Sequence, residues 1–271
     1  MERELWKSLY LLAVQLDKPW GCWLYSTSEV LGVYFWAVVH DRPTSWAVDA
    51  QAWPDDLRPV WLPAQSTLSR RLRRTEAVEL MTAVEQHLVA LLALGQYWVH
   101  IMDGKALAVS AVSKDPDAGY GRGAGTRQKG YKLHAIWSSG PMPVAWCLAP
   151  MNASEKTVAG DLIPTLSGGG YILADTQFDV GCLYDLATAH GFQLVTKKTA
   201  GRSRNGLGHR RQSPARLRSI ELLKSSFGRA LYNLPAWVRR FQRVRPWVQA
   251  KSILAGLKWL LQHEPIKLAL A

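Results

Sequence analysis

The sequence predicts an α/β fold in which helices flank a mixed β-sheet, preceded by a helical N-terminal region. Three observations support this prediction. Apolar residues recur at helical spacing near the N-terminus and again over 76–94. From Tyr97 to Leu148 the pattern changes to the period of two that is typical of strands. Between Tyr171 and Thr196 a strand, a helix and a strand follow one another, which favours a parallel pair with a right-handed crossover.

The first sixty residues divide into a helical and an irregular part. Residues 1–20 have an apolar stripe at helical spacing, formed by Leu5, Leu9, Leu12 and Leu16. Residues 21–62 are rich in Trp and Pro, and we predict that they are irregular. The reason is that proline interrupts a long helix, and prolines stand at 43, 54, 59 and 63.

The segment over 63–94 resembles a helix-turn-helix. Pro63 can start a helix, and Ser66 or Thr67 can cap it. Leu68 and Leu72 share one face, and the other faces carry Arg70, Arg71, Arg73 and Arg74. This pattern is typical of a recognition helix with small polar residues at its start, although a solvated basic helix would show the same pattern. A second helix is predicted from Glu76 to Leu94.

The strand-like part begins with four predicted strands: Tyr97–Met102, Leu107–Val112, Gly130–Trp137 and Pro143–Leu148. The Gly-rich segment between the second and third, 114–129, is predicted to be a loop. Next come a helix over 155–166 capped by Asn152 or Ser154, a strand over 171–174, a helix over 180–190 capped by Asp179, and a strand over 192–196. Residues 197–218 are predicted to form a loop, and later helices to cover 216–231, to start at Pro235 and to run towards Gln262.

Three acids stand at places where metal chemistry is plausible. Asp103 follows the first predicted strand, Asp175 follows the strand over 171–174, and Glu221 lies in a later helix. A carboxylate at the end of a buried strand is costly unless it binds something, and converging carboxylates suit Mg²⁺, which prefers oxygen ligands. If the two strands are neighbours, Asp103 and Asp175 meet at one edge of the sheet. Two metal ions held there could bind a scissile phosphate, with Asp103 bridging both ions.

The charge distribution points to a polyanionic partner. The formal net charge is +12, and residues 196–245 contain fourteen Lys or Arg and one acid, Glu221. A solvated surface normally mixes charges of both signs, so this segment is better explained as a surface that binds nucleic-acid phosphates. Beside the four arginines of 70–74, the predicted DNA contacts are Lys105, Lys132, Lys197, Lys198, Arg202, Arg204, Arg210, Arg211, Arg239, Arg240, Arg243 and Arg245.

Composition also excludes several classes of protein. Almost half of the residues are hydrophobic, so general disorder is not expected. No apolar run is long enough to span a bilayer, and the N-terminus lacks the order of a signal peptide. Three widely spaced cysteines predict neither a disulfide framework nor a zinc site. These features predict a cytoplasmic protein, and its affinity for DNA predicts association with the nucleoid.

Several motifs together resemble the DDE transposases of bacterial insertion sequences, which carry an RNase H-like catalytic domain. Asp103-Gly104-Lys105 resembles the first-acid motif, and the segment over 129–134 resembles the Gly-Tyr-Lys-Leu-His strand after it. Leu173-Ala174-Asp175-Thr176 resembles the second-acid motif, and 191–195 the next strand. The segment over 237–251 resembles the C-terminal basic helix. The match covers about residues 97–260.

The resemblance implies an RNase H-like mixed sheet and metal-dependent cleavage and joining of double-stranded DNA. The substrates would be the terminal inverted repeats of a mobile element and a target DNA, and the cofactors two Mg²⁺ or Mn²⁺ ions. It assigns residues 1–95 to DNA binding and 96–271 to the catalytic domain with C-terminal basic helices. Because transposition joins two DNA ends, a homodimer is expected in the active complex.

One departure from the family pattern keeps alternatives open. The family's third acid usually stands in a helix patterned Arg-x-x-Ile-Glu-Arg-x-Phe, and this chain has no such pattern. Either Glu221 is the third acid in a variant helix, or a segment that carried it has been lost. In the second case the protein is a truncated remnant that binds DNA and cuts weakly. A housekeeping nuclease with an RNase H-like fold is a further alternative.

Overall fold

The computed structural model describes residues 1–18, 21, 23–110, 112–123, 125–196 and 234–263. The chain forms two compact units. The first contains residues 1–88 together with 242–271, and the second contains 89–241. The functional division into a DNA-binding part, 1–95, and a catalytic part, 96–271, stays a prediction.

The first unit is helical. Its elements are α1 (Glu2–Leu16), α2 (Thr27–Val39), α3 (Thr44–Ala47), the 3-10 turn η1 (Ala50–Ala52), α4 (Gln65–Arg71), most of α5 (Thr75–Leu91) and nearly all of α9 (Phe241–His263). Helices α1 and α2 pack closely because Gly32 has no side chain: a Cβ there would come within 2.7 Å of the Tyr10 ring. The Trp6 indole N–H donates to the Gly32 carbonyl at 2.8 Å. The predicted N-terminal helix is therefore confirmed.

The prediction that residues 21–62 are irregular is wrong. Helix α2 covers thirteen of them and is buried along most of its length, including Val30, Leu31 and Phe35. A helix that is apolar all round has no amphipathic period, so the pattern analysis could not detect it. Its start does carry a sequence signal, because Ser26 and Glu29 form a capping box. Several tryptophans pack in this core, with the Trp36 and Trp53 rings stacked at 4.6 Å.

Two helix starts also differ from the predictions. Helix α4 begins at Gln65 with Ala64 in the capping position, so neither Ser66 nor Thr67 caps it. No helix starts at Pro235: residues 234–240 form turns, and α9 begins at Phe241. Within the first unit, α9 is fixed by buried polar contacts, since Gln249 donates to the Glu85 carboxylate at 2.7 Å and Lys251 donates to the Val38 carbonyl at 3.1 Å.

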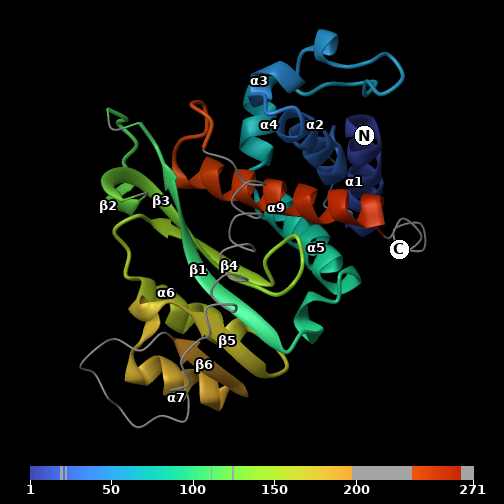
Figure 1. Cartoon of the computed structure of the whole chain (residues 1–271). Helices are drawn as coiled ribbons and strands as arrows, with labels where there is room; N and C mark the ends of the chain where they lie inside the picture. The colour runs from blue at the N-terminus through green and yellow to red at the C-terminus, as the bar shows by residue number, and fades with distance from the viewer. Residues whose placement is uncertain (19–20, 22, 111, 124, 197–233, 264–271) are drawn as a thin grey trace. The chain divides into compact units, whose positions relative to one another are not determined.

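The second unit is built on a mixed sheet (Figure 1). Its strands are β1 (Val99–Ala108), β2 (Gly119–Gly123), β3 (Thr126–Trp137), β4 (Ala145–Pro150), β5 (Gly170–Ala174) and β6 (Phe192–Thr196). The order is β2-β3-β1-β5-β6, and β4 also pairs with β3. Strand β3 is antiparallel to β1, β2 and β4, whereas β5 is parallel to β1 and β6 is parallel to β5. This mixed sheet with its parallel half after β1 is the expected RNase H-like arrangement.

Two strand predictions are wrong in detail. The two strands predicted over 97–102 and 107–112 are one continuous strand, β1, so Asp103 lies inside a strand and not at its end. The predicted loop over 114–129 contains β2 and the start of β3. Glycine weakens a strand pattern, and the glycines of this segment concealed a hairpin. Strand β6 has the predicted bounds.

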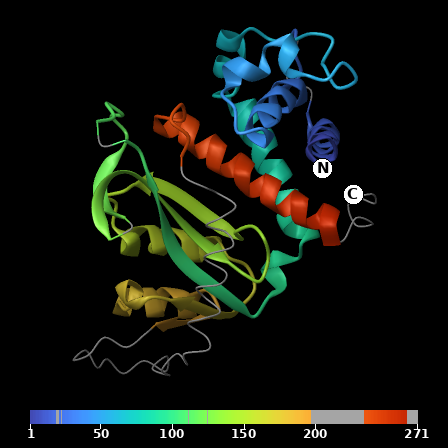
Figure 2. The ribbon, with the colours of Figure 1, turned by 45° about the horizontal axis from the view of Figure 1, so that its top comes forward.

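Helices cover one face of the sheet. Helix α6 (Glu155–Leu162) and the 3-10 turn η3 (Ile163–Thr165) join β4 to β5, and the 3-10 turn η4 (Thr176–Phe178) and helix α7 (Gly181–Ala189) join β5 to β6. Their apolar side chains pack on Met102, Ile136, Ile172, Ala174 and Leu194. Figure 2 shows the ribbons of α6 and α7 on the same side of the sheet. We call this the helix-covered face. The predicted cap of α6 is Ser154, whose hydroxyl accepts the Thr157 N–H at 3.4 Å.

Candidate active site

Asp103 and Asp175 lie at the same level of two neighbouring strands. Strands β1 and β5 are parallel, and their last aligned pair is Ile101 with Leu173. Two residues further along each strand are Asp103 and Asp175. Because side chains alternate with a period of two, both acids share the face that carries Ile101 and Leu173, opposite the helices. We call this the Asp103 face.

Both acids are accessible to solvent. Strand β5 ends at Ala174, whereas β1 continues to Ala108 alongside β3. Asp103, paired with Ala135 of β3, is partly exposed although it lies within a strand. Asp175 follows the last residue of β5 and is exposed. Neighbouring acids at the carboxyl ends of parallel strands are well placed to receive a ligand.

The backbone orients the Asp175 side chain. Asp175 occupies the N-cap of η4, and its Oδ1 atom accepts the Gln177 N–H at 2.9 Å. Within the described residues its second carboxylate oxygen accepts no hydrogen bond. One oxygen therefore fixes the rotamer, and the other is available to a ligand.

The two predicted lysines lie on opposite faces. Lys105 is two residues from Asp103 in β1 and so shares the Asp103 face, where burial lowers the pKa of its ammonium group. Lys132 pairs with Ala106, which puts it on the helix-covered face. There its ammonium group forms a mostly buried ion pair with Glu155 at the start of α6. Lys132 and Ala135, the partner of Asp103, are three residues apart in β3, so their side chains lie on opposite faces of the sheet. This placement is not compatible with the prediction that Lys132 contacts phosphate near Asp103.

His134 is a buried strand residue. It lies opposite Gly104 on the helix-covered face and is only 2% exposed. Burial lowers the pKa of His134 to about 4; the Glu155 carboxylate opposes that shift and the Lys132 ammonium adds to it. The imidazole is therefore neutral at physiological pH and is separated by the sheet from Asp103.

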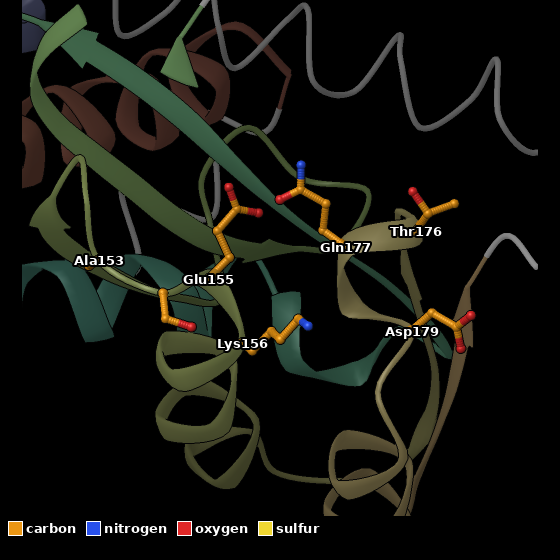
Figure 3. A pocket seen from close by; sticks show the side chains of 7 residues that line it. Ala153, Glu155, Lys156, Thr176, Gln177 and Asp179 are labelled. Atoms are coloured by element: carbon orange, nitrogen blue, oxygen red, sulfur yellow. The ribbon is translucent and has the colours of Figure 1, made fainter. Parts of the chain in front are cut away.

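An open cleft of about 370 Å³ lies beside the loop that follows Asp175. One wall is the start of α6, with Ser154, Glu155 and Lys156, and the other is the segment with Thr176, Gln177 and Asp179. Figure 3 shows the Glu155 and Gln177 side chains extending from these two walls. Asp179 does not cap α7, contrary to the prediction; its carboxylate accepts the Tyr184 hydroxyl at 3.0 Å. The cleft therefore contains charges of both signs.

Asp115 has a structural role that the sequence did not reveal. Its carboxylate accepts the Asp117 N–H, the Tyr131 hydroxyl at 2.9 Å and the Arg240 N–H at 2.7 Å. Burial alone would raise the pKa of Asp115, but these hydrogen bonds outweigh burial and hold the pKa below its usual range. Asp117 accepts the Phe241 N–H at 3.0 Å. The two acids thus attach the segment before α9 to the second unit.

The predicted DNA contacts of the first unit differ in accessibility. Arg70, Arg73 and Arg74 are exposed. Arg71 is 6% exposed; its guanidinium donates to the Tyr25 carbonyl and to the Thr27 hydroxyl and lies over the Trp23 ring. Because these internal contacts occupy Arg71, we remove it from the set of proposed phosphate contacts.

The C-terminal arginines also vary. Arg240 and Arg243 are exposed, Arg245 is partly buried, and the Arg239 guanidinium donates to the Pro235 and Val238 carbonyls. Glu221 and six predicted cationic contacts lie outside the described residues, namely Lys197, Lys198, Arg202, Arg204, Arg210 and Arg211. In the described part of the chain no three His, Cys, Asp or Glu side chains form a group that could hold a metal ion.

Two of the three acids nevertheless suit a divalent metal. Both are carboxylates, which supply the hard oxygen ligands that Mg²⁺ and Mn²⁺ prefer. They share one face and one level of the sheet, and an N–H donor orients Asp175. The donor set therefore fits such an ion as far as the described residues extend, with a third ligand required from elsewhere.

Comparison with known proteins identifies the family. Residues 94–235, more than half of the chain, match the family described as "Transposase DDE domain". A solved structure, a piggyBac transposase synaptic complex with hairpin DNA, is similar over 97% of this chain and 73% of its own, with 9% identity and a TM-score of 0.48. No curated protein matches. No helix among the described residues is long and apolar enough to cross a membrane. On the family match, and with two acids placed side by side within it, the chain belongs to the DDE transposase domain family.

Proposed function

We propose that this transposase cleaves and joins double-stranded DNA at the inverted repeats of an insertion sequence, with Asp103 and Asp175 in the catalytic centre. The observation that carries the proposal is the parallel register of β1 and β5, which puts both acids on one face at one level. Asp175 also caps η4, but that role occupies only one of its oxygens.

Divalent metal ions are the normal cofactors of DDE transposases. Asp103 and Asp175 would hold two Mg²⁺ or Mn²⁺ ions, which at such sites activate the attacking oxygen and stabilise the leaving oxygen. The Gln177 N–H keeps the Asp175 carboxylate in one orientation, so this side chain loses little conformational entropy when the substrate binds. Lys105, on the same face, would pair with a phosphate oxygen, and its partly buried position would strengthen that contact.

The third acid is proposed to be Glu221, and the substrates are proposed to be element ends and target DNA. Exposed arginines of the N-terminal region, Arg70, Arg73 and Arg74, would contact DNA phosphates there. These contacts would position the duplex without reading its sequence. A homodimer would bring two element ends together.

The direct test is cleavage of labelled element-end DNA with Mg²⁺ or Mn²⁺, comparing the parent with Asp103→Ala, Asp175→Ala and Glu221→Ala. The proposal expects cleavage by the parent and loss of cleavage in all three variants. Survival of cleavage in Glu221→Ala would show that another residue supplies the third ligand. As a matched control, Asp161→Ala removes an exposed acid of α6 and should leave cleavage unchanged.

Other outcomes would support the alternatives. DNA binding without cleavage by the parent would favour the truncated remnant that occupies element ends. Cleavage of any duplex, with no preference for element ends and no joined product, would favour a general nuclease. Sedimentation of the protein with and without two DNA ends would determine the oligomeric state separately.

A further inference from the structure

The β2–β3 hairpin has two chemically different faces. Strand β2 has the sequence Gly119-Tyr120-Gly121-Arg122-Gly123, so its glycines all point to one side. A Cβ at Gly119 would collide with the Asn152 side chain, and a Cβ at Gly121 would collide with the Met151 carbonyl. The glycine face therefore packs directly against residues 151–152. This close packing leaves the opposite face turned outward.

The outward face carries three cations and an aromatic ring. Tyr120 pairs with Lys129 and Arg122 pairs with Arg127, and all four side chains share one face because paired residues and residues two apart do so. Arg122 and Arg127 are exposed, and Tyr120 is 51% exposed. No carboxylate forms an ion pair with these cations among the residues that the structure describes. The Asp115 carboxylate does interact electrostatically with Lys129, so the charges that no described carboxylate balances are those of Arg122 and Arg127.

Arg122 and Arg127 are an unfavourable pair for the hairpin itself. Like charges directly opposite one another on an antiparallel ladder destabilise it. The Tyr120 ring offsets this only in part, since the Arg127 guanidinium and the Lys129 ammonium each lie 5.8 Å from its centroid. Lys129 also donates to the Ser113 carbonyl at 2.8 Å. An anionic partner between the two arginines would relieve the repulsion.

The cationic hairpin residues lie on the same side of the sheet as the two acids, and the fully buried Tyr131 and Leu133 stand between the two groups on β3. Lys129 and Arg127 are separated from Ala135, the partner of Asp103, by even numbers of residues in the uninterrupted strand β3. They therefore lie on the same side of that strand as Asp103. Lys129 is six residues from Ala135, which corresponds to roughly 20 Å at the rise of a strand. That separation is less than one turn of B-DNA, about 34 Å.

We propose that Tyr120, Arg122, Arg127 and Lys129 form a binding surface for the sugar-phosphate backbone of duplex DNA. The surface would hold the duplex to one side of the Asp103–Asp175 pair, by charge and without reading bases. This inference depends on the proposed function for the choice of DNA as the polyanion. It does not depend on cleavage, because backbone binding requires no metal.

The test is the affinity of the full chain for a fluorescent duplex, measured by anisotropy in EDTA over a series of salt concentrations. Arg122→Gln/Arg127→Gln is compared with Arg3→Gln/Arg58→Gln, which removes the same charge from two exposed arginines paired with Asp56 and Asp55. The hairpin variant should bind about ten-fold more weakly than this control. Its plot of log affinity against log salt should be shallower by about 1.8, at 0.9 for each lost phosphate contact.

A second variant separates binding from folding. Arg127→Glu puts a carboxylate opposite Arg122, so the hairpin should be as stable as in the parent or more stable, while affinity for the duplex falls further. Equal affinities of the double-Gln variant and its control, within two-fold, would overturn the proposal. So would an Arg127→Glu protein that keeps its melting temperature and binds the duplex as tightly as the parent. Failure of cleavage in every protein would contradict the catalytic proposal and leave this test intact.

Discussion

The two faces of the sheet in the second unit differ in what their side chains do. The helix-covered face buries a large apolar cluster in which Ile136, Ile172 and Leu194 pack under α6 and α7. Its polar residues are internal, because Lys132 pairs with Glu155 and His134 is buried. On the Asp103 face a smaller buried cluster, Ile101, Leu173 and Val195, lies beside two acids. Leu107, Tyr131 and Leu133 are also fully buried on this face, towards the β2–β3 hairpin. Sequence neighbours such as Met102 and Asp103 therefore have unrelated roles.

Strand parity therefore decides which side chains pack under the helices and which share the face of Asp103. A change on the helix-covered face should act on stability, and a change of Asp103 or Asp175 should act on chemistry. The register also explains why Lys105 and Lys132, which look equivalent in the sequence, do not share an environment. If the two faces are as separate as the register implies, stability and activity can be changed independently.

The largest expected effect is the loss of activity in Asp175→Asn. Asparagine can still accept the Gln177 N–H through its side-chain oxygen, so the free energy of unfolding should change by less than about 0.5 kcal/mol. The lost negative charge should slow cleavage by about three orders of magnitude, equivalent to roughly 4 kcal/mol in the barrier. Single-turnover cleavage and urea unfolding measure the two quantities.

Two other outcomes for Asp175→Asn would contradict the separation of stability and activity between the two faces. Rates within ten-fold of the parent would remove Asp175 from the catalytic centre. A large loss of stability would mean that the Asp103 face also depends on its acids for folding.

The next largest effect is a loss of stability in Ile172→Ala. Ile172 is fully buried on the helix-covered face, and removing its methyl groups should lower the free energy of unfolding by roughly 2–5 kcal/mol. The adjacent Tyr171 is 45% exposed on the other face, so Tyr171→Ala should cost about 1 kcal/mol or less. Urea unfolding of both variants tests the contrast. Equal losses would show that the two faces are packed alike.

Much of the sheet could be predicted from the sequence because its strands have clear signals. The alternation of strand, helix and strand over 171–196 gave β5, α7 and β6 nearly at their observed bounds. The conditional prediction about Asp103 and Asp175 required β1 and β5 to be neighbours, and they are. Their roles in catalysis and those of the DNA contacts stay predictions, and Glu221 lies outside the described residues.

What could not be predicted depends on tertiary contacts that leave no local pattern. Helix α2 is buried all round, so it lacks a polar face. Arg71 looked like its neighbours Arg70 and Arg73, and only its contacts with Tyr25 and Thr27 distinguish it. Strand β2 did carry a signal, the alternation of glycine with Tyr120 and Arg122, but glycine normally indicates a loop. The contacts with residues 151–152 explain why glycine is required there.

The smallest effect is the pH dependence contributed by His134. Burial lowers the pKa of His134 to about 4, against 6.5 in the unfolded chain. Between these two values the imidazole is protonated in the unfolded state and neutral in the folded state. Stability present above pH 6.5 is therefore lost as the pH falls towards 4, by roughly 2 kcal/mol between pH 6.5 and 5. Urea unfolding of the parent and of His134→Leu at both pH values measures this, with the difference between the two slopes as the readout. The parent should lose more stability than the variant on acidification, because leucine cannot take up a proton in either state. Equal losses of stability in the parent and in His134→Leu would mean that the imidazole is protonated in the folded protein. That would require His134 to be accessible to solvent or to contact the Glu155 carboxylate more closely.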